Sequence, residues 1–401
     1  MPPEPGDRFD LAVVSSFAPA DVIGGAERLA WEEARLLAGE HRVAFVSTSP
    51  PTAEATFEQV RLSAWLRSLY HPSRPSRSAQ RRVAFHLLTL FNPATFLEAL
   101  ALFRRLRPRV VHTHNLQALS PSVWLAARMS GAVVVHTHHD VWLLCQRSNM
   151  TTAGGRYCEE RASACRICRV TRIAKGSQTR LVAREAFSSG WLRARLRRTG
   201  TIVRPFATQT EHPAKEPPSP PAIVFLGRLT ESKGVRVLVD AFRVAQHRLG
   251  GGVRLVIAGG GPLAAAAECW AREPGVAYLG EVDAAARSTL LRDAALVGIP
   301  SLSPDSSSLV FFEALVAGVP VVASDIAGLA ELAELGTAKL VPPGDAAALA
   351  DAIVELFSEP ARLERLRRAA FDRRCLASPE RFRRELDELL SAYLAGAGEQ
   401  G

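Results

Sequence analysis

The sequence predicts an α/β protein made of two doubly wound, Rossmann-like domains that face each other across a cleft. Its 401 residues exceed what one hydrophobic core usually organises. Short apolar runs alternate with amphipathic helical segments in both halves of the chain, as in parallel sheets covered by helices. Between the halves, five prolines within 213–221 indicate a linker.

The first half contains apolar runs that are short enough to be buried parallel strands. They lie at residues 11–15, 43–46, 110–112, 133–136 and 201–203. A glycine turn, Gly24-Gly25, separates the first run from an amphipathic helix that we expect over 26–38.

The second half repeats this alternation more regularly. Its predicted strands lie at residues 222–226, 253–258, 276–279, 296–299, 319–323 and 340–341. A helix is expected directly after Gly234, and Asp345 is suited to cap the start of another. Ligands of such folds bind at the carboxyl ends of the strands, which is where the motifs below lie.

These elements divide the chain into four parts. We predict an N-terminal domain over 1–205, a proline-rich linker over 206–221, a second domain over 222–375 and a C-terminal segment over 376–401. The last segment contains an amphipathic helix from Pro379 to Leu394, whose plainest interpretation is a packing helix.

Composition indicates a large soluble enzyme, because 47% of the residues are hydrophobic and 22% are charged. No apolar run is long enough to cross a bilayer, and the N-terminus lacks the basic-then-apolar order of a signal peptide. We therefore expect a cytoplasmic protein.

The net charge of +9 is uneven, because arginines gather at 61–82 and 161–204. Such clusters suit an anionic membrane surface better than nucleic acid, since no nucleic-acid-binding motif accompanies them. The apolar residues mixed with arginine in 62–90 fit membrane contact on the inner face, or equally a packed helix with solvated arginines.

Two motifs of the second half have the chemistry of an anion site. Asp305 and Glu313, with seven residues between them, flank a loop that opens a helix, and N–H groups at a helix start attract anions. Arg228 and Lys233 follow another strand and suit a diphosphate, whose charge grows when its bond to a sugar breaks.

These motifs resemble the retaining glycosyltransferases of family 4, which have the GT-B fold. The resemblance covers nearly the whole chain and is most specific over 222–345. It rests on Asp305, Glu313 and the following Gly318-Val319-Pro320-Val321-Val322, together with the Gly227-Arg228 and Lys233-Gly234 pairs. The family carries a glutamate where this chain has Asp305.

The resemblance implies a role for each matching residue. Arg228 and Lys233 would neutralise the leaving diphosphate, Asp305 would face the sugar, and Glu313 would bind the ribose hydroxyls. The remaining donor-binding residues implied are Gly25 in a loop over the phosphate, Ser308, Leu309 and Val310 at the helix start, and Gly259 and Gly261 near the base. The C-terminal helix would pack back on the first domain. No catalytic metal is implied.

Five histidines gather near two predicted strand ends: His112, His114, His136, His138 and His139. A metal on them is disfavoured, because the acidic partners usual for such sites are missing nearby in the sequence. The stretch Thr137-His138-His139-Asp140 resembles the Thr-x-His-Asp motif of a family 4 subgroup. This resemblance implies that His139 lies beside the transferred sugar, with His138 as the second choice.

Four of the six cysteines, Cys145, Cys158, Cys165 and Cys168, fall close together. Their number and the final Cys-x2-Cys pair predict a structural zinc site, and the same subgroup often shows such an insertion. Free buried thiols remain the alternative, whereas disulfides are disfavoured without a secretion signal.

The predicted function is transfer of a sugar, with retention of anomeric configuration, from a nucleotide diphosphate sugar to a glycan, lipid-linked or small-molecule acceptor. The alternative is a GT-B protein that binds the nucleotide sugar without transferring it, on account of Asp305. An epimerase of related fold and a pure interaction module are further candidates. The sequence specifies neither the base, nor the sugar, nor the acceptor.

Overall fold

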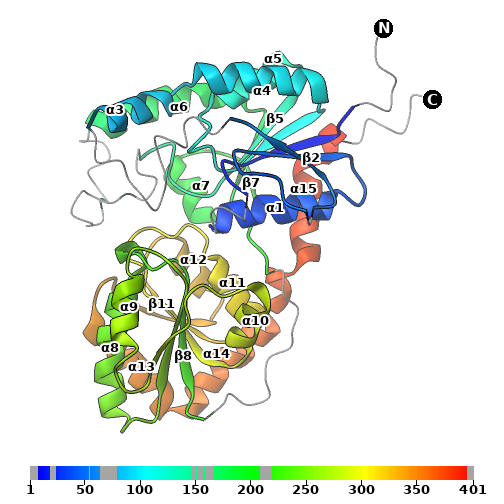
Figure 1. The fold of residues 1–401 in the computed structure, drawn as a ribbon. Coiled ribbons are helices and arrows are strands. Elements are labelled where there is room, and N and C mark those ends of the chain that lie inside the picture. Colours follow the sequence, from blue (N-terminus) through cyan, green and yellow to red (C-terminus); the bar gives the residue numbers. More distant parts are fainter. Residues whose placement is uncertain are drawn as a thin grey trace.

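The computed structural model describes residues 8–18, 24–53, 55–63, 79–145, 150, 158, 166–207 and 219–394. Two parallel sheets, each covered by helices, form two domains that lie one above the other in Figure 1. This confirms the predicted α/β fold class of two Rossmann-like domains.

The first sheet has the strand order β3-β2-β1-β4-β5-β6-β7 in the described part of the chain. Its strands are β1 (Leu11–Val14), β2 (Val43–Ser47), β3 (Glu58–Arg61), β4 (Val110–Thr113), β5 (Val133–His138), β6 (Arg184–Phe187) and β7 (Thr201–Ile202). Strands β3 and β6 were not expected from the sequence, because each carries charged residues in place of a continuous apolar run.

The second sheet has the order β10-β9-β8-β11-β12-β13, and its described strand pairs are all parallel. Its strands are β8 (Ala222–Leu226), β9 (Arg254–Ala258), β10 (Val276–Tyr278), β11 (Ala294–Ile299), β12 (Val321–Ser324) and β13 (Ala338–Val341). All six coincide with predicted apolar runs to within a few residues.

Helices flank both sheets. Those of the first domain are α1 (Gly25–Leu37), α3 (Ala79–Leu88), α4 (Pro93–Leu106), α5 (Ser122–Met129), α6 (Arg166–Gln178) and α7 (Gly190–Leu196), with the 3₁₀ turn η2 (Thr179–Leu181). The second half contains η3 (Glu231–Lys233), α8 (Val235–Arg248), α9 (Ala264–Trp270), α10 (Ala284–Arg292), α11 (Leu309–Val316), α12 (Gly328–Ala333), α13 (Ala346–Ser358), α14 (Pro360–Asp372), η4 (Arg374–Ala377) and α15 (Pro379–Leu394).

Alternation along the strands explains why each sheet has a core on both faces. In β1, Ala12 and Val14 pack with the apolar residues of α4 and α5, while Leu11 and Val13 pack with those of α1 and α15. The second sheet is divided in the same way, with α8 and α13 on one face and α11 on the other.

Helix α15 leaves the second domain and packs on the first, beside α1 and β2 in Figure 1. Its Phe382 is fully buried and stacks on Phe206, with 4.5 Å between the ring centroids. Arg381 donates hydrogen bonds to the carbonyl oxygens of Arg204 and Pro205. The chain therefore crosses twice between the domains.

A single carboxylate of the second domain binds the start of a helix in the first. Glu331 of α12 accepts hydrogen bonds from the backbone N–H groups of Gly190 (3.1 Å) and Trp191 (2.7 Å), at the first turn of α7. Arg204 donates a further bond of 3.3 Å to the same carboxylate. A negative charge at a helix N-terminus is favourable, so this contact fixes the two domains relative to each other.

None of the described helices combines the length and the apolar character that a membrane crossing requires.

Replacing Phe382 by alanine should lower the free energy of unfolding by about 3–5 kcal/mol, because the change empties a fully buried aromatic site. Urea unfolding followed by circular dichroism measures the loss. Phe371→Ala is the matched control, since Phe371 of α14 is 41% exposed and should lose less than about 1 kcal/mol. Equal losses in both variants would show that α15 does not stabilise the first domain.

Candidate functional site

A cavity of about 540 Å³ lies between the carboxyl ends of the two sheets. Its walls come from the loops after β1, β4 and β5 in the first domain and after β8 and β11 in the second. Eight of the eleven residues predicted to catalyse or to bind the donor line it: Gly25, His139, Arg228, Lys233, Asp305, Ser308, Leu309 and Val310. The other three, Gly259, Gly261 and Glu313, are not among its lining residues.

The start of α11 opens into this cavity. Ser308 is the N-cap residue, and its side chain accepts no capping hydrogen bond. The N–H groups of Leu309 and Val310 lie in the first helical turn, where no carbonyl of the same helix can pair with them. A Cβ atom added to Gly25 would lie 3.7 Å from the Cβ of Leu309, so the glycine loop of the first domain faces this helix start.

Lys233 and Asp305 are brought together from two loops of the second domain. Lys233 Nζ donates to Asp305 Oδ2 over 2.6 Å. Gly234 makes this approach possible, because its φ of 70° is left-handed and a Cβ atom there would lie 1.8 Å from the carbonyl oxygen of Pro300. One predicted cation is therefore paired with the carboxylate predicted to face the sugar.

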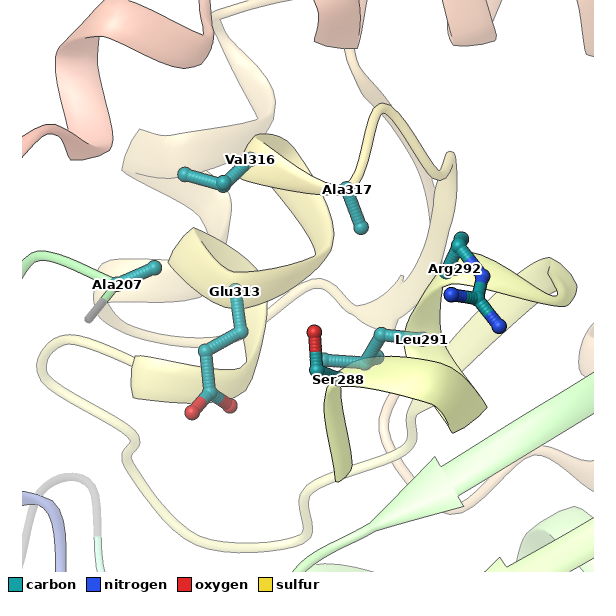
Figure 2. A pocket seen from close by; sticks show the side chains of 7 residues that line it. All are labelled: Ala207, Ser288, Leu291, Arg292, Glu313, Val316 and Ala317. Atoms are coloured by element: carbon teal, nitrogen blue, oxygen red, sulfur yellow. The ribbon is translucent and has the colours of Figure 1, made fainter. Parts of the chain in front are cut away.

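Glu313 is held by two arginines. Its carboxylate accepts two bonds from Arg287 of α10, one of them 2.8 Å long, and a third of 3.4 Å from Arg28 of α1. The cavity beside it in Figure 2, lined also by Ser288 and Val316, measures only about 10 Å³, which is room for about one water molecule. Arg287, in contrast, lines the large cavity.

Gly259 and Gly261 lie where the loops after β8 and β9 touch. Added Cβ atoms would lie 1.9 Å from the carbonyl oxygen of Gly227 and 2.7 Å from that of Leu229. These glycines thus allow the backbone contact that holds the loop of Arg228. Their contact with a nucleotide base stays a prediction.

His138, the last residue of β5, and His139, which follows it, have different surroundings. His139 lines the cavity, and its carbonyl oxygen accepts a hydrogen bond from Ser306 of the opposite domain. His138 is buried, stacks on Phe187 with 4.9 Å between centroids and lies 3.8 Å from Glu185. The geometry favours His139 over His138 as the residue beside a ligand.

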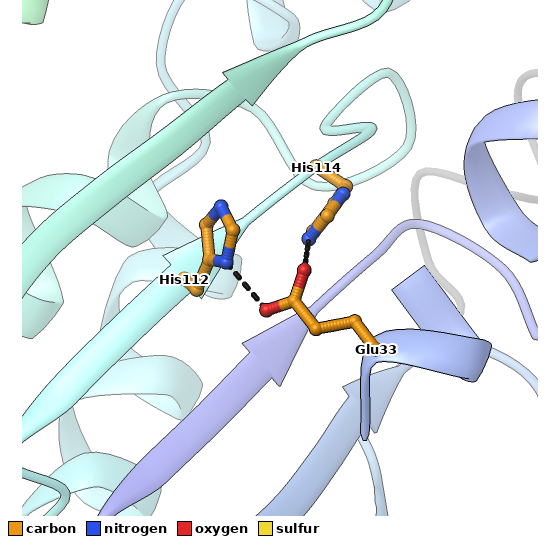
Figure 3. Close-up of side chains that lie close together, drawn as sticks. All are labelled: Glu33, His112 and His114. Atoms are coloured by element: carbon orange, nitrogen blue, oxygen red, sulfur yellow. Dashed lines mark hydrogen bonds and ion pairs between the residues drawn. The ribbon is translucent and has the colours of Figure 1, made fainter. Parts of the chain in front are cut away.

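The expectation that no acidic partner lies near the histidines is wrong. Glu33, from α1, lies between His112 and His114 of the first sheet (Figure 3). Its Oε1 is 2.5 Å from His112 Nδ1, and its Oε2 is 3.1 Å from His114 Nε2. Burial alone would raise the pKa of Glu33, but the two histidines lower it to about 2. Sequence spacing could not show this contact, because Glu33 belongs to another element.

Several cavity residues were absent from the predicted site. They are Glu27, Asn115, Asp140, Arg287 and Ser306. Asp140 is the last residue of the Thr137–Asp140 motif that identified His139, and Glu27 follows Gly25 by two residues, so their position in the motifs was a usable signal. Arg287 and Asn115 lie in no recognisable motif.

Asp140 is half-buried in the cavity wall and accepts a 2.7 Å hydrogen bond from the backbone N–H of Trp142. Burial raises the pKa of Asp140 to about 6, although that bond and Lys175 act in the opposite direction. Lys175 is fully buried against the Trp142 ring, and burial lowers its pKa to about 7.

The predicted zinc site includes Cys165, which lies outside the described residues. Of its described members, Cys145 is buried in the first core, and Cys158 and Cys168 are half-buried. Zinc binding by these four cysteines stays a prediction.

Replacing Asp140 by asparagine should stabilise the protein above pH 6 by about 1 kcal/mol, a value reduced for the partial exposure of the side chain. Because the folded pKa of about 6 exceeds the ordinary value of 3.8, ionisation costs the folded state stability as pH rises from about 4 to 6. Urea unfolding at pH 4 and pH 7 measures this, and equal differences at both pH values would contradict it.

Two family models match the chain. Residues 23–203 match Glycosyltransferase Family 4, and residues 220–359 match Glycosyl transferases group 1. Among curated proteins, an uncharacterised 42.6 kDa protein in the cps region of Klebsiella pneumoniae is 31% identical over 72 residues, which are 18% of this chain and 19% of that protein. The chain thus spans about a fifth of the length of this relative.

Solved structures share the whole fold. Sucrose-phosphate synthase from Thermosynechococcus elongatus has a TM-score of 0.75 at 20% identity, covering 97% of this chain and all of the other. HepE from Anabaena in complex with UDP-glucose has a TM-score of 0.69 at 16% identity, and the match covers 96% of this chain and 100% of the other. Trehalose-6-phosphate synthase, studied for glycosyl transfer with retention, has a TM-score of 0.66 at 15% identity. The match covers 96% of this chain and 98% of the other. The matches to both halves and the shared fold identify the chain as a GT-B glycosyltransferase.

Proposed function

We propose that the protein transfers a sugar from a nucleotide diphosphate sugar to an acceptor with retention of anomeric configuration. One observation carries the proposal: Arg228, Lys233 and the N–H groups at the start of α11, which have no carbonyl partner within that helix, line one cavity between the domains. HepE, which shares the fold, was solved with UDP-glucose, and trehalose-6-phosphate synthase transfers with retention; both support this donor class and outcome.

Departure of the diphosphate is the step that this site is built to assist. As the bond between the sugar and the phosphate oxygen breaks, negative charge grows on the leaving group, a bond from the sugar to the acceptor oxygen forms, and the proton of the acceptor hydroxyl passes to the departing phosphate oxygen. Arg228 and Lys233 are fixed cations at this place, and the N–H groups of Leu309 and Val310 add the positive end of a helix. Such preorganised groups stabilise the transition state more than the bound donor.

Asp305 takes part by exchanging partners. In the free protein it pairs with Lys233 at 2.6 Å, and a donor phosphate would compete for that ammonium group. The released Asp305 carboxylate would then accept hydrogen bonds from sugar hydroxyls, with His139 on the other wall. Glu313 would reach the ribose only after its pairs with Arg287 and Arg28 rearrange.

The alternative is a protein that binds the nucleotide sugar without transferring it. The observation that favours it is the Lys233–Asp305 pair, which neutralises one leaving-group cation in the free protein. Mass spectrometry with a panel of nucleotide sugars detects donor binding, and release of nucleotide detects transfer or hydrolysis. Binding without release would support the alternative.

We also propose that the first domain contacts an anionic membrane, on which a lipid-linked or glycan acceptor would be presented. Helix α6 exposes Val170 and Ile173 to 56% and 61%, with Arg169 and Arg172 exposed beside them. Apolar side chains inserted among arginines suit a surface of acidic lipid headgroups.

Lys233→Ala and Arg228→Ala should each lower kcat/KM for release of UDP from UDP-glucose by about 100-fold or more, because each removes a charge from the leaving-group side of the cavity. Arg236→Ala is the matched control, since Arg236 lies three residues after Lys233, in the first turn of α8, and does not line the cavity. Steady-state kinetics measures the ratio. Full activity in both cavity variants would exclude the assigned site.

The double variant Val170→Glu/Ile173→Glu should reduce flotation with phosphatidylglycerol vesicles at low salt several-fold, because it places negative charge in the contact surface. Val244→Glu, at a 47% exposed position of α8 in the second domain, is the control. Wild-type protein that stays at the bottom of the gradient would refute membrane contact.

A further inference from the structure

A continuous chain of polar contacts runs from the cavity into the first domain. His139 lines the cavity, and its Nε2 lies 2.9 Å from Nδ1 of His114, with the two rings stacked. His114 in turn places its Nε2 3.1 Å from Oε2 of Glu33. Glu33 is fully buried and His114 is 3% exposed, so His139 connects this chain with the cavity.

The charge of Glu33 decides which way these contacts are polarised. The low pKa of this buried carboxyl means that it is ionised and can only accept hydrogen bonds. Nε2 of His114 lies 3.1 Å from the ionised Oε2, in an ion-pair contact outside hydrogen-bond alignment, and a hydrogen on this nitrogen is favoured because a lone pair there would face the negative charge. Burial lowers the pKa of His114, with Glu33 opposing, and a neutral ring with hydrogen on Nε2 has a bare Nδ1.

The same reasoning continues to His139. A bare Nδ1 on His114 can only accept, so Nε2 of His139 must be the donor across the 2.9 Å contact. Burial and the neighbouring histidines lower the pKa of His139 well below its usual value, which keeps this ring neutral. A neutral ring with hydrogen on Nε2 has Nδ1 free to accept a hydrogen bond.

His112 provides an internal comparison. It binds the other oxygen of Glu33, Oε1, at 2.5 Å, and its Nε2 lies 2.7 Å from the hydroxyl of Thr137. It is buried to the same extent as Glu33, yet no contact joins it to His139 in the described structure. His112 therefore shares the environment of His114 without sharing its position in the chain to the cavity.

We propose that Glu33 and His114 are positioning residues that hold His139 in one tautomer, with hydrogen on Nε2 and Nδ1 as an acceptor for a hydroxyl of the bound sugar. The role toward the sugar rests on the proposed function, whereas the tautomer does not. Positioning of this kind resembles the orientation of one histidine by a buried carboxylate, extended here by a second imidazole ring.

The tautomer is read directly from long-range ¹H–¹⁵N spectra of protein labelled at its ten histidines, with His139→Asn used for assignment. In the wild-type protein, Nε2 of His139 should be protonated and Nδ1 bare. His114→Asn should abolish this fixed state and give exchange between tautomers. A wild-type spectrum with hydrogen on Nδ1 of His139 would overturn the proposal, as would a bare Nε2 on His114, for example because a metal ion occupies it.

Kinetics with UDP-glucose supplies the second readout. His114→Asn and Glu33→Gln should each lower kcat for UDP release about tenfold while changing KM less than about twofold, because an aligned hydrogen bond is lost in the transition state. His112→Asn is the matched control: it keeps the His114–Glu33 contact, and its amide can still donate to Glu33, so the His139 tautomer and kcat should change less than in His114→Asn. Thermal unfolding establishes that all three are folded.

The two readouts separate the two claims. A fixed His139 tautomer without nucleotide release by the wild-type protein from any sugar of the panel would contradict the proposed function and support the positioning contact. UDP release with an unchanged kcat in His114→Asn would overturn the positioning role while the proposed function stands.

Discussion

The cavity exists only while the carboxyl ends of two separate parallel sheets face each other, and the Glu331 carboxylate is central to that arrangement. It comes from the second domain and binds two N–H groups at the start of α7 in the first, with Arg204 as a third donor. Ser306 and Arg28 add contacts across the same gap. Because neither domain forms the cavity alone, its shape follows from these few polar contacts.

Within this arrangement, three cations of the cavity wall are already matched with carboxylates. Lys233 pairs with Asp305, and Arg287 and Arg28 share Glu313. Such pairs keep long side chains ordered and avoid buried unpaired charge, but they must open for a phosphate to bind. The binding of an anionic donor is then an exchange of partners, so its net free-energy gain is smaller than three unpaired cations would give.

Much of the fold was predictable, because β1 and β8 are uninterrupted apolar strands, β9 is apolar after Arg254, and the helices between them have clear periodicity. Strands β3 and β6 were missed, since charged residues interrupt the apolar pattern in each, at the edge of the sheet in β3 and inside it in β6. In the site, motifs located Arg228, Lys233 and Asp305 at strand ends. Glu33 and Arg287 could not be found in this way, because only the packing of α1 and α10 brings their side chains to distant partners.

The double attachment of Glu313 has a thermodynamic consequence. Arg28 belongs to the first domain and Arg287 to the second, so this one carboxylate belongs both to a contact between domains and to the predicted ribose site. A donor that binds Glu313 in place of Arg28 breaks a contact between the domains and so makes domain closure less favourable. By linkage, closure of the domains lowers donor affinity by the same free energy. This reciprocity would make the angle between the domains depend on whether the donor is bound. An acceptor that binds the first domain alone and changes this angle would then change the affinity for the nucleotide.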